Sequence, residues 1–150
     1  MARFSKRSRA NLDGCHDDII AVCNELIIVT DFSVVFGNRP PELQFELYQK
    51  GREFKNDKWI VARQNEVVTY CDGFKKLSNH NKTPSDAVDL IPYPSKYSDR
   101  NEQYYLAGAF LAVAYRLKVQ GIIESSFRWG GRWKSFKDYP HFERVKAKGN

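Results

Sequence analysis

The N-terminal third of the chain contains a segment in which apolar residues recur every three to four positions. This period predicts an amphipathic helix over residues 17–28, behind the polar start HDD. The next segment, DFSVVFG, is β-branched and aromatic and ends at Gly37, which favours a buried strand with Arg39 just beyond it. Pro41 can open a second helix, PELQFELYQK, and Gly51 can close it. We therefore expect helix, strand and helix in this order.

The second half of the chain has one long helical pattern between shorter β-like segments. Within residues 52–77, WIV and EVVTY have the composition of short strands and CDG that of a turn. A helix that begins after Ser98 or Asp99 and ends at Gly121 is predicted by apolar residues in a four-three-four spacing, which are Leu106, Phe110, Val113 and Leu117. The chain then returns to strand composition in IIESSFRW, turns at the Gly-Gly pair 130–131, and continues into HFERV.

Size and charge limit the class of protein. The 150 residues, of which 42% are hydrophobic, provide enough apolar surface for one sizeable core, which predicts a single domain over residues 1–150. A net charge of +6 favours polyanionic partners such as nucleic acid, acidic lipid or an anionic cell wall. Much of the excess lies in RFSKRSR and in Arg144, Lys146 and Lys148, which we interpret as solvated tails. The charge thus indicates a class of partner and no function.

Cysteine usage and apolar runs indicate the compartment. Cys15, Cys23 and Cys71 are odd in number and form no CxxC pair, so neither a disulfide framework nor a thiolate zinc site is indicated. The basic start is followed by NLDGCHDD rather than an apolar run with a cleavage site, which argues against a secretory signal. No apolar stretch reaches membrane-spanning length. We expect a protein made in a reducing cytoplasm, without membrane insertion.

Two polar stretches carry histidines close to aspartates: SNHNKTPSDAVDL and KDYPHFE. A catalytic zinc is typically held by three protein ligands drawn from His, Asp, Glu and Cys, with a further position open. His80, His141 and either Asp86 or Asp89 would supply such a set. Because side chains alternate along a strand, only one of the two aspartates shares a face with Ala87. The pattern alone does not choose between them, and such residues are more often ordinary surface hydrogen-bonding groups.

Asp138 stands three residues before His141, and the intervening Pro140 stiffens the segment. A carboxylate at this spacing could stand beside a metal rather than on it, where it could take a proton from a reacting water. The alternative is that Asp138 caps a turn, which is common for aspartate before such a sequence. Trp129 and Trp133 could likewise wall a cleft or pack in the core.

The two stretches together, SNHNKTPSDAVDLIPYP and FRWGGRWKSFKDYPHFE, resemble the paired signatures of a superfamily of zinc peptidases. These are the D-alanyl-D-alanine carboxypeptidases and L-alanyl-D-glutamate endopeptidases, which share a fold with the hedgehog signalling domain. The likeness also takes in DFSVVFGNR, LYQKGR, VTYCDGFKKLSNH and YYLAGAFLAVAYRL, so it covers most of the chain. Small bacteriophage endolysins are the most similar members.

The resemblance implies roles for five residues. His80, Asp89 and His141 match the zinc ligands, with Asp89 chosen because it ends the Ala-Val-Asp triplet. Asp138 matches the catalytic carboxylate, and Arg39 matches the arginine that helps to hold the substrate and polarise its carbonyl. One departure is the longer spacer KTPSD between the first histidine and the aspartate, where many relatives have a glycine and fewer residues.

The resemblance also implies a fold and an activity. The expected fold is α+β, with an antiparallel sheet that carries the zinc ligands and helices packed on its other face. The expected activity is zinc-dependent hydrolysis of the L-alanyl-D-glutamate bond in the peptidoglycan stem peptide, by a monomeric phage endolysin that reaches the wall after release from the host cytoplasm. A carboxypeptidase that removes a terminal D-alanine would share every ligand.

A second alternative belongs to another class. A basic, non-enzymatic protein could bind nucleic acid through Lys and Arg, with Phe and Tyr as stacking surfaces. This alternative leaves both motifs unexplained, and we therefore expect no nucleic-acid partner.

Overall fold

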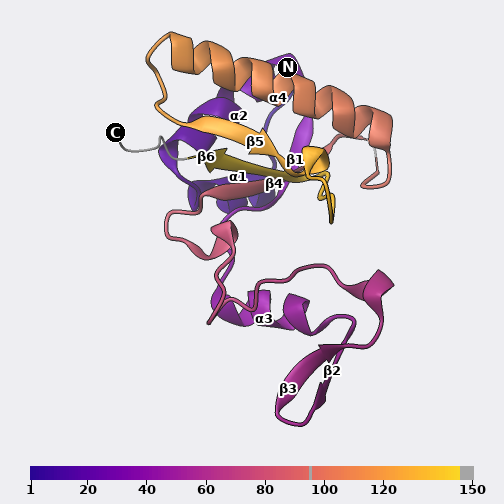
Figure 1. Cartoon of the computed structure of the whole chain (residues 1–150). Coiled ribbons are helices and arrows are strands. Elements are labelled where there is room, and N and C mark those ends of the chain that lie inside the picture. The colour runs from indigo at the N-terminus through magenta and orange to yellow at the C-terminus, as the bar shows by residue number, and fades with distance from the viewer. Residues whose placement is uncertain (95, 146–150) are drawn as a thin grey trace.

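The computed structural model describes residues 1–94 and 96–145. In this part of the chain a four-stranded antiparallel sheet has the order β1-β4-β6-β5 (Figure 1). Its strands are β1 (Phe32–Phe36), β4 (Ala87–Pro92), β5 (Ser126–Trp129) and β6 (His141–Val145). The α-helices are α1 (Lys6–Asp13), α2 (Asp17–Val29), α3 (Pro41–Gln49) and α4 (Arg100–Val119). The predicted α+β fold with an antiparallel sheet and packed helices is therefore confirmed.

Helices α2 and α4 pack against each other, while α1 packs against β1 and α4 against β4 and β5 (Figure 1). The core between these layers is apolar, and the Phe110 ring of α4 lies 4.4 Å from the Phe142 ring of β6, centroid to centroid. The helices begin where the sequence supplies caps: the His16 ring accepts a hydrogen bond from the Asp18 amide, and the Asp99 carboxylate one from the Glu102 amide. The fully buried residues of this core include Leu12, Ile19, Val22, Leu26, Val88, Leu90 and Phe110. Close packing of this kind holds the central strands in a fixed register.

A smaller part of the molecule lies apart from the sheet (Figure 1). It comprises α3, the hairpin of β2 (Arg52–Lys55) and β3 (Lys58–Val61), and the segment that follows, and we call residues 41–77 the small lobe. The hairpin turns at Asn56 and Asp57, whose φ angles of 50° and 58° are those of the mirror-image turn that Asn and Asp tolerate. Phe45 of α3 contacts Trp59 of β3 edge to face, so helix and hairpin form one unit.

The structure corrects the interpretation of the basic segments as solvated tails. The basic segment 3–9 is not a solvated tail, because α1 begins at Lys6 and buries Ser8 and, further on, Leu12. The helical spacing of apolar residues in α1 is weak because so few of its residues face the core. Arg144 is likewise no tail residue: it lies in β6 with its Nε 3.3 Å from the Asp86 carboxylate. Lys146 and Lys148 fall outside the described residues.

The predicted strand EVVTY does not form. A short 3₁₀ turn, Gln64–Glu66, is followed by irregular backbone whose side chains line a cleft, which accounts for the β-branched residues. The strand expected over residues 122–129 starts only at Ser126, because Ile122 is exposed in a turn after α4 and the Ser125 amide donates to the Asp18 carboxylate. Among the described residues, no helix combines the length and the apolar character needed to cross a membrane.

Candidate metal centre

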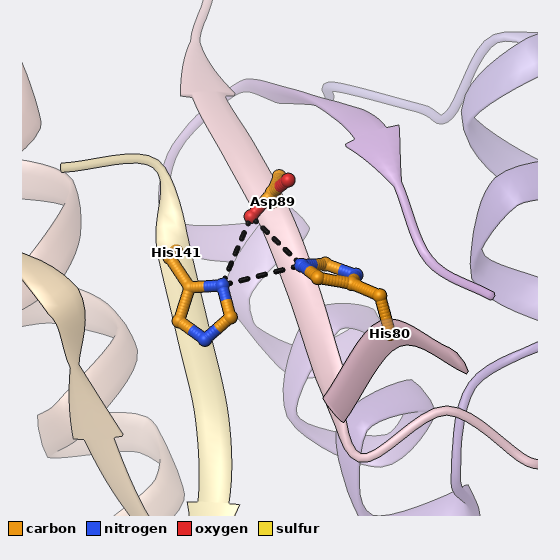
Figure 2. Close-up of side chains that lie close together, drawn as sticks. All are labelled: His80, Asp89 and His141. Carbon is orange, nitrogen blue, oxygen red and sulfur yellow. Dashed lines mark hydrogen bonds and ion pairs between the residues drawn. The ribbon is translucent and has the colours of Figure 1, made fainter. Parts of the chain in front are cut away.

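Three side chains from separate elements meet at one point (Figure 2). His80 comes from a 3₁₀ turn, Asn79–Asn81, while Asp89 lies on β4 and His141 on β6. The His80 Nε2 atom lies 3.2 Å from both the Asp89 Oδ1 atom and the His141 Nδ1 atom, and these last two are 3.3 Å apart. The predicted trio of side chains is thus brought together in a single buried cluster.

Sheet register and local capping position these ligand atoms. Asp89 and His141 are direct partners in the antiparallel β4-β6 ladder, so their side chains project side by side. His80 is presented by a turn with a capping box. In it the Ser78 hydroxyl accepts a hydrogen bond from the Asn81 backbone N–H, and the Asn81 side-chain oxygen accepts one from the Ser78 backbone N–H. The other candidate aspartate, Asp86, stands outside the cluster and pairs with cations instead.

The spacing of the three atoms fits a metal ion. Ligand atoms held at about 2.0–2.1 Å around a tetrahedral zinc lie roughly 3.4 Å from one another. The observed separations of 3.2 to 3.3 Å between the ligand atoms of His80, Asp89 and His141 match this edge length. Two imidazole nitrogens that face each other beside a carboxylate are a donor set suited to such an ion.

The outer nitrogen of each imidazole has a hydrogen-bond acceptor. The His80 Nδ1–H donates to the Gly37 carbonyl at 2.7 Å, and the His141 Nε2–H donates to the Glu143 carboxylate at 2.8 Å. These bonds fix the tautomers so that the lone pair of each inner nitrogen points to the common centre. Glu143 is itself held by the Asn79 amide at 2.7 Å and by the Arg128 guanidinium. Sequence reasoning missed Glu143, although its place two residues after His141 puts both side chains on the same face of β6. The role of a backbone carbonyl such as that of Gly37 cannot be recognised in the sequence, because every residue has one.

The charges around the cluster reinforce this arrangement. Burial by itself would raise the pKa of Asp89, but His80 and His141 outweigh it and the pKa lies well below the usual range, so the carboxylate stays ionised. Burial would also raise the pKa of Glu143, yet its bonds with His141 and Asn79 lower that pKa to about 2. For Asp138 the balance is reversed, because burial and then the Asp89 charge raise its pKa. The pKa of Asp138 is therefore shifted in the opposite direction from that of Asp89, although the two carboxylates are neighbours.

A cleft of about 620 Å³ opens over the metal cluster. Asp138 lines it with its Oδ2 atom 4.0 Å from the His141 Nδ1 atom, outside the ligand set and partly exposed to solvent. Trp133 also lines the cleft, with its ring centroid 5.1 Å from that of His141. Trp129 is instead buried and donates its indole N–H to the Tyr139 carbonyl. Of Trp129 and Trp133, only Trp133 is therefore placed to contact a molecule bound in the cleft.

The two ends of the Arg39 guanidinium bind the cluster and the small lobe, respectively. Its Nη2 atom lies 3.2 Å from the Asp89 Oδ2 atom, and its Nη1 donates to the Gln44 Oε1 atom at 2.8 Å. Gln44 is completely buried in α3 and donates in turn to the Thr69 hydroxyl and the Cys71 carbonyl. Sequence reasoning missed Gln44, since a glutamine on a helix gives no sign of burial. The small lobe is thus connected through Arg39 to the Asp89 carboxylate.

The chain is similar to known proteins in both sequence and structure. Residues 72–144, which carry His80, Asp89, Asp138 and His141, match the family described as D-alanyl-D-alanine carboxypeptidase. The crystal structure of the L-Ala D-Glu endopeptidase ChiX from Serratia marcescens superposes with a TM-score of 0.67 at 25% identity, covering 95% of this chain and 90% of that one. Over residues 72–144 the chain is thus similar to this family, and its fold is similar to that of the endopeptidase ChiX. The chain is also similar to the peptidoglycan L-alanyl-D-glutamate endopeptidase CwlK from Bacillus subtilis (strain 168), with 27% identity over 123 residues. That alignment covers 77% of the chain and 61% of the relative's length.

The contact between Glu143 and His141 gives a first testable expectation. Glu143→Gln keeps the shape of the side chain but removes the negative charge that faces the His141 N–H, so zinc affinity should fall about 10–100-fold, as for other outer partners of ligand histidines. Competition against a chromophoric chelator would measure the dissociation constant. Glu25→Gln, which breaks a surface pair with Arg116, is a matched control. Unchanged zinc affinity in Glu143→Gln would show that the His141 tautomer does not depend on this carboxylate.

Proposed function

We propose that the chain is a zinc peptidase that hydrolyses the L-alanyl-D-glutamate bond in the stem peptide of bacterial peptidoglycan. The observation that carries this proposal is the His80–Asp89–His141 cluster at the base of a cleft, with an unligated carboxylate, Asp138, beside it. The bond is suggested by the two relatives described above, both of which are named as endopeptidases for this linkage. We assign His80, Asp89 and His141 as the metal ligands.

Zinc fits the donor set of two imidazoles and one carboxylate. When bound, it supplies Lewis-acid chemistry: it lowers the pKa of a water molecule to about 7 and polarises an amide carbonyl. The residues of the chain provide the remaining functions, which are to orient the substrate, to move the proton and to stabilise the developing charge.

Asp138 is assigned as the residue that moves the proton. Its carboxylate is close enough to the centre to accept a proton from the attacking water, yet it is not one of the ligands. The same group can then deliver that proton to the leaving amine as the carbon–nitrogen bond breaks. Partial burial in the cleft and the neighbouring Asp89 charge raise its pKa, which favours proton uptake.

Arg39 is assigned to the developing negative charge on the substrate carbonyl. Its guanidinium is held in place by Asp89 and Gln44 and lines the cleft, so its position needs no rearrangement on substrate binding. A well-placed donor of this kind contributes roughly 3–4 kcal/mol to transition-state stabilisation. Because Arg39 also contacts a metal ligand, it links substrate handling to the geometry of the metal site.

The biological setting that we propose is that of a bacteriophage endolysin. Residues 1–150 would act as one monomeric catalytic domain, made in the host cytoplasm and released to the wall. The net charge of +6 supports attraction to an anionic wall, and the signature motifs are similar to those of the phage members that the sequence resembles.

Mass spectrometry of digested peptidoglycan tests the proposed bond. Purified sacculi incubated with the zinc-loaded protein should yield fragments with a newly exposed D-glutamate amine. Loss of a single D-alanine would instead assign the carboxypeptidase activity for which the matched family is named. A chelator-treated sample provides the control for metal dependence. Absence of any hydrolysis, together with a salt-sensitive shift of DNA on a gel, would favour the nucleic-acid alternative.

A further inference from the structure

Two aromatic side chains that line the cleft contact each other. Tyr70 belongs to the small lobe and Phe136 to the segment that leads into Asp138, and both line the cleft. Their ring centroids are 5.2 Å apart with an interplanar angle of 77°, an edge-to-face contact. Despite this contact, Tyr70 remains 43% exposed and Phe136 41% exposed. A contact that leaves both rings so exposed does not serve to fill the core.

The backbone at Phe136 is in an unfavourable conformation. Its φ angle of 50° lies in the left-handed region, which bulky residues rarely adopt because Cβ approaches the following carbonyl. The other non-glycine residues with positive φ among those described are Asn56 and Asp57, which form the hairpin turn. Strain of this kind persists where the surrounding structure enforces it, and it is concentrated at ligand clamps and active sites. Here it occurs at an exposed phenyl ring that lines the cleft and contacts Tyr70, two residues before Asp138.

Tyr70 is fixed from its own side of the cleft. The Gln64 amide donates to its hydroxyl at 2.6 Å, and the Arg52 guanidinium carbon lies 5.4 Å from the centroid of its ring. Arg52 is itself buried, with its guanidinium carbon 4.0 Å from the centroid of the Tyr48 ring. The small lobe therefore presents Tyr70 as an oriented surface against which Phe136 can close.

We propose that Tyr70 and Phe136 form a clamp that closes over the stem peptide and determines how tightly the peptidase holds it. This inference rests on the proposed function. The rings offer apolar faces to the alanyl methyl group and to the planes of the peptide bonds, which carry no charge. Closing the top of the cleft also excludes water from the region between Arg39 and Asp138, which strengthens their electrostatic effect on the reacting amide. Tyr70 and Phe136 are thus specificity-determining residues, separate from the groups that carry out the chemistry.

Two substitutions at one position separate a clamp from a packing contact. Phe136→Ala removes the ring but keeps a Cβ in the left-handed region, whereas Phe136→Gly removes both the ring and the strain. The glycine variant should therefore melt about 2–4 °C above the alanine variant. Both variants should raise KM for a soluble stem peptide about tenfold, with a much smaller change in kcat and no change in zinc content. A merely structural ring would show the opposite pattern, with lower stability and an unchanged KM.

Two further variants complete the test. Phe54→Ala is the matched control, because Phe54 is 58% exposed on β2 and contacts Trp59 but does not line the cleft; its KM should equal that of the wild type. Tyr70→Ala should raise KM like Phe136→Ala, and the double variant should show less than the product of the two single effects, because neither ring closes the cleft alone. Independent, fully multiplicative effects would overturn the clamp.

Calorimetric binding of the same peptide distinguishes this inference from the proposed function. If the wild type cleaves the peptide and Phe136→Gly keeps the wild-type KM, the clamp is wrong and the function stands. If the wild type binds the peptide without cleaving it, the function is wrong, and the dissociation constants of the variants still decide the clamp: a tenfold increase supports it and no change overturns it. Wild-type protein that neither binds nor cleaves the peptide overturns both.

Discussion

Asp138→Asn is expected to reduce kcat by about 10²–10⁴-fold, the usual contribution of general acid–base catalysis, with little change in KM. The amide has nearly the same size as the carboxylate, so the walls of the cleft should be preserved. It cannot accept a proton from the attacking water. Asp138 lies 4.0 Å from the nearest ligand nitrogen and outside the ligand cluster, so zinc binding should also be preserved. Steady-state kinetics on purified stem peptide would measure the change.

The comparison that decides this prediction is zinc content against turnover in the same Asp138→Asn preparation. A fully metallated protein with wild-type turnover would rule out proton transfer by Asp138. Loss of zinc would instead make Asp138 a ligand. A melting temperature close to that of the wild type is the control for folding, and it is expected because the Asp138 side chain is partly exposed and its substitution leaves no cavity in the core.

Removing a metal ligand should have the largest effect of all. Asp89→Ala and His141→Ala each leave two of the three protein ligands, and both should lose zinc on dialysis and show no hydrolysis above background. Asp89→Ala also leaves the Arg39 guanidinium without its carboxylate partner, so it should lower stability more than its size suggests. Metal analysis by plasma emission and a turbidity assay on sacculi would measure the two losses.

Asp86→Asn is the matched control for the metal-ligand variants. Asp86 is as buried as many core residues and pairs with Lys82 at 2.8 Å and Arg144 at 3.3 Å, but it takes no part in the cluster. Its amide variant should melt at a lower temperature, because two cations lose their partner, and should keep zinc. If instead Asp86→Asn loses the metal while Asp89→Ala retains it, the assignment of the aspartate after the long spacer is wrong.

The sequence predicts much of this site because its chemistry lies in contiguous motifs. His80, Asp89 and His141 are found together in space as the two signatures imply, and their register follows from adjacent antiparallel strands. The periodic helices α2 and α4 are also close to their predicted bounds, since long amphipathic patterns are dictated by one buried face. Local patterns are therefore sufficient where one stretch of chain determines one element.

The features that escaped prediction depend on contacts between distant segments. Gln44 is buried only because the small lobe folds over it and supplies acceptors from residues 69 and 71. EVVTY has strand composition, but it joins neither sheet in the described part of the chain, and its residues from Val67 to Tyr70 line the cleft. The segment 3–9 is highly charged, yet the first strand requires α1 as a packing partner. In each case tertiary context overrides local composition.

The close approach at Gly37 has a consequence for the size of the catalytic unit. A Cβ atom at this position would lie 1.9 Å from the Asn11 carbonyl oxygen at the end of α1, so no larger residue fits without displacing the backbone. The displaced group would be the carbonyl that accepts the His80 N–H, 43 positions further along the chain. Residues 72–144, which match the family, therefore depend on a backbone carbonyl that lies outside them. Transplanted into another scaffold, this segment would keep its histidines and aspartates but would lose the acceptor that orients His80. The proposed catalytic unit thus includes the N-terminal helix α1, against which Gly37 packs.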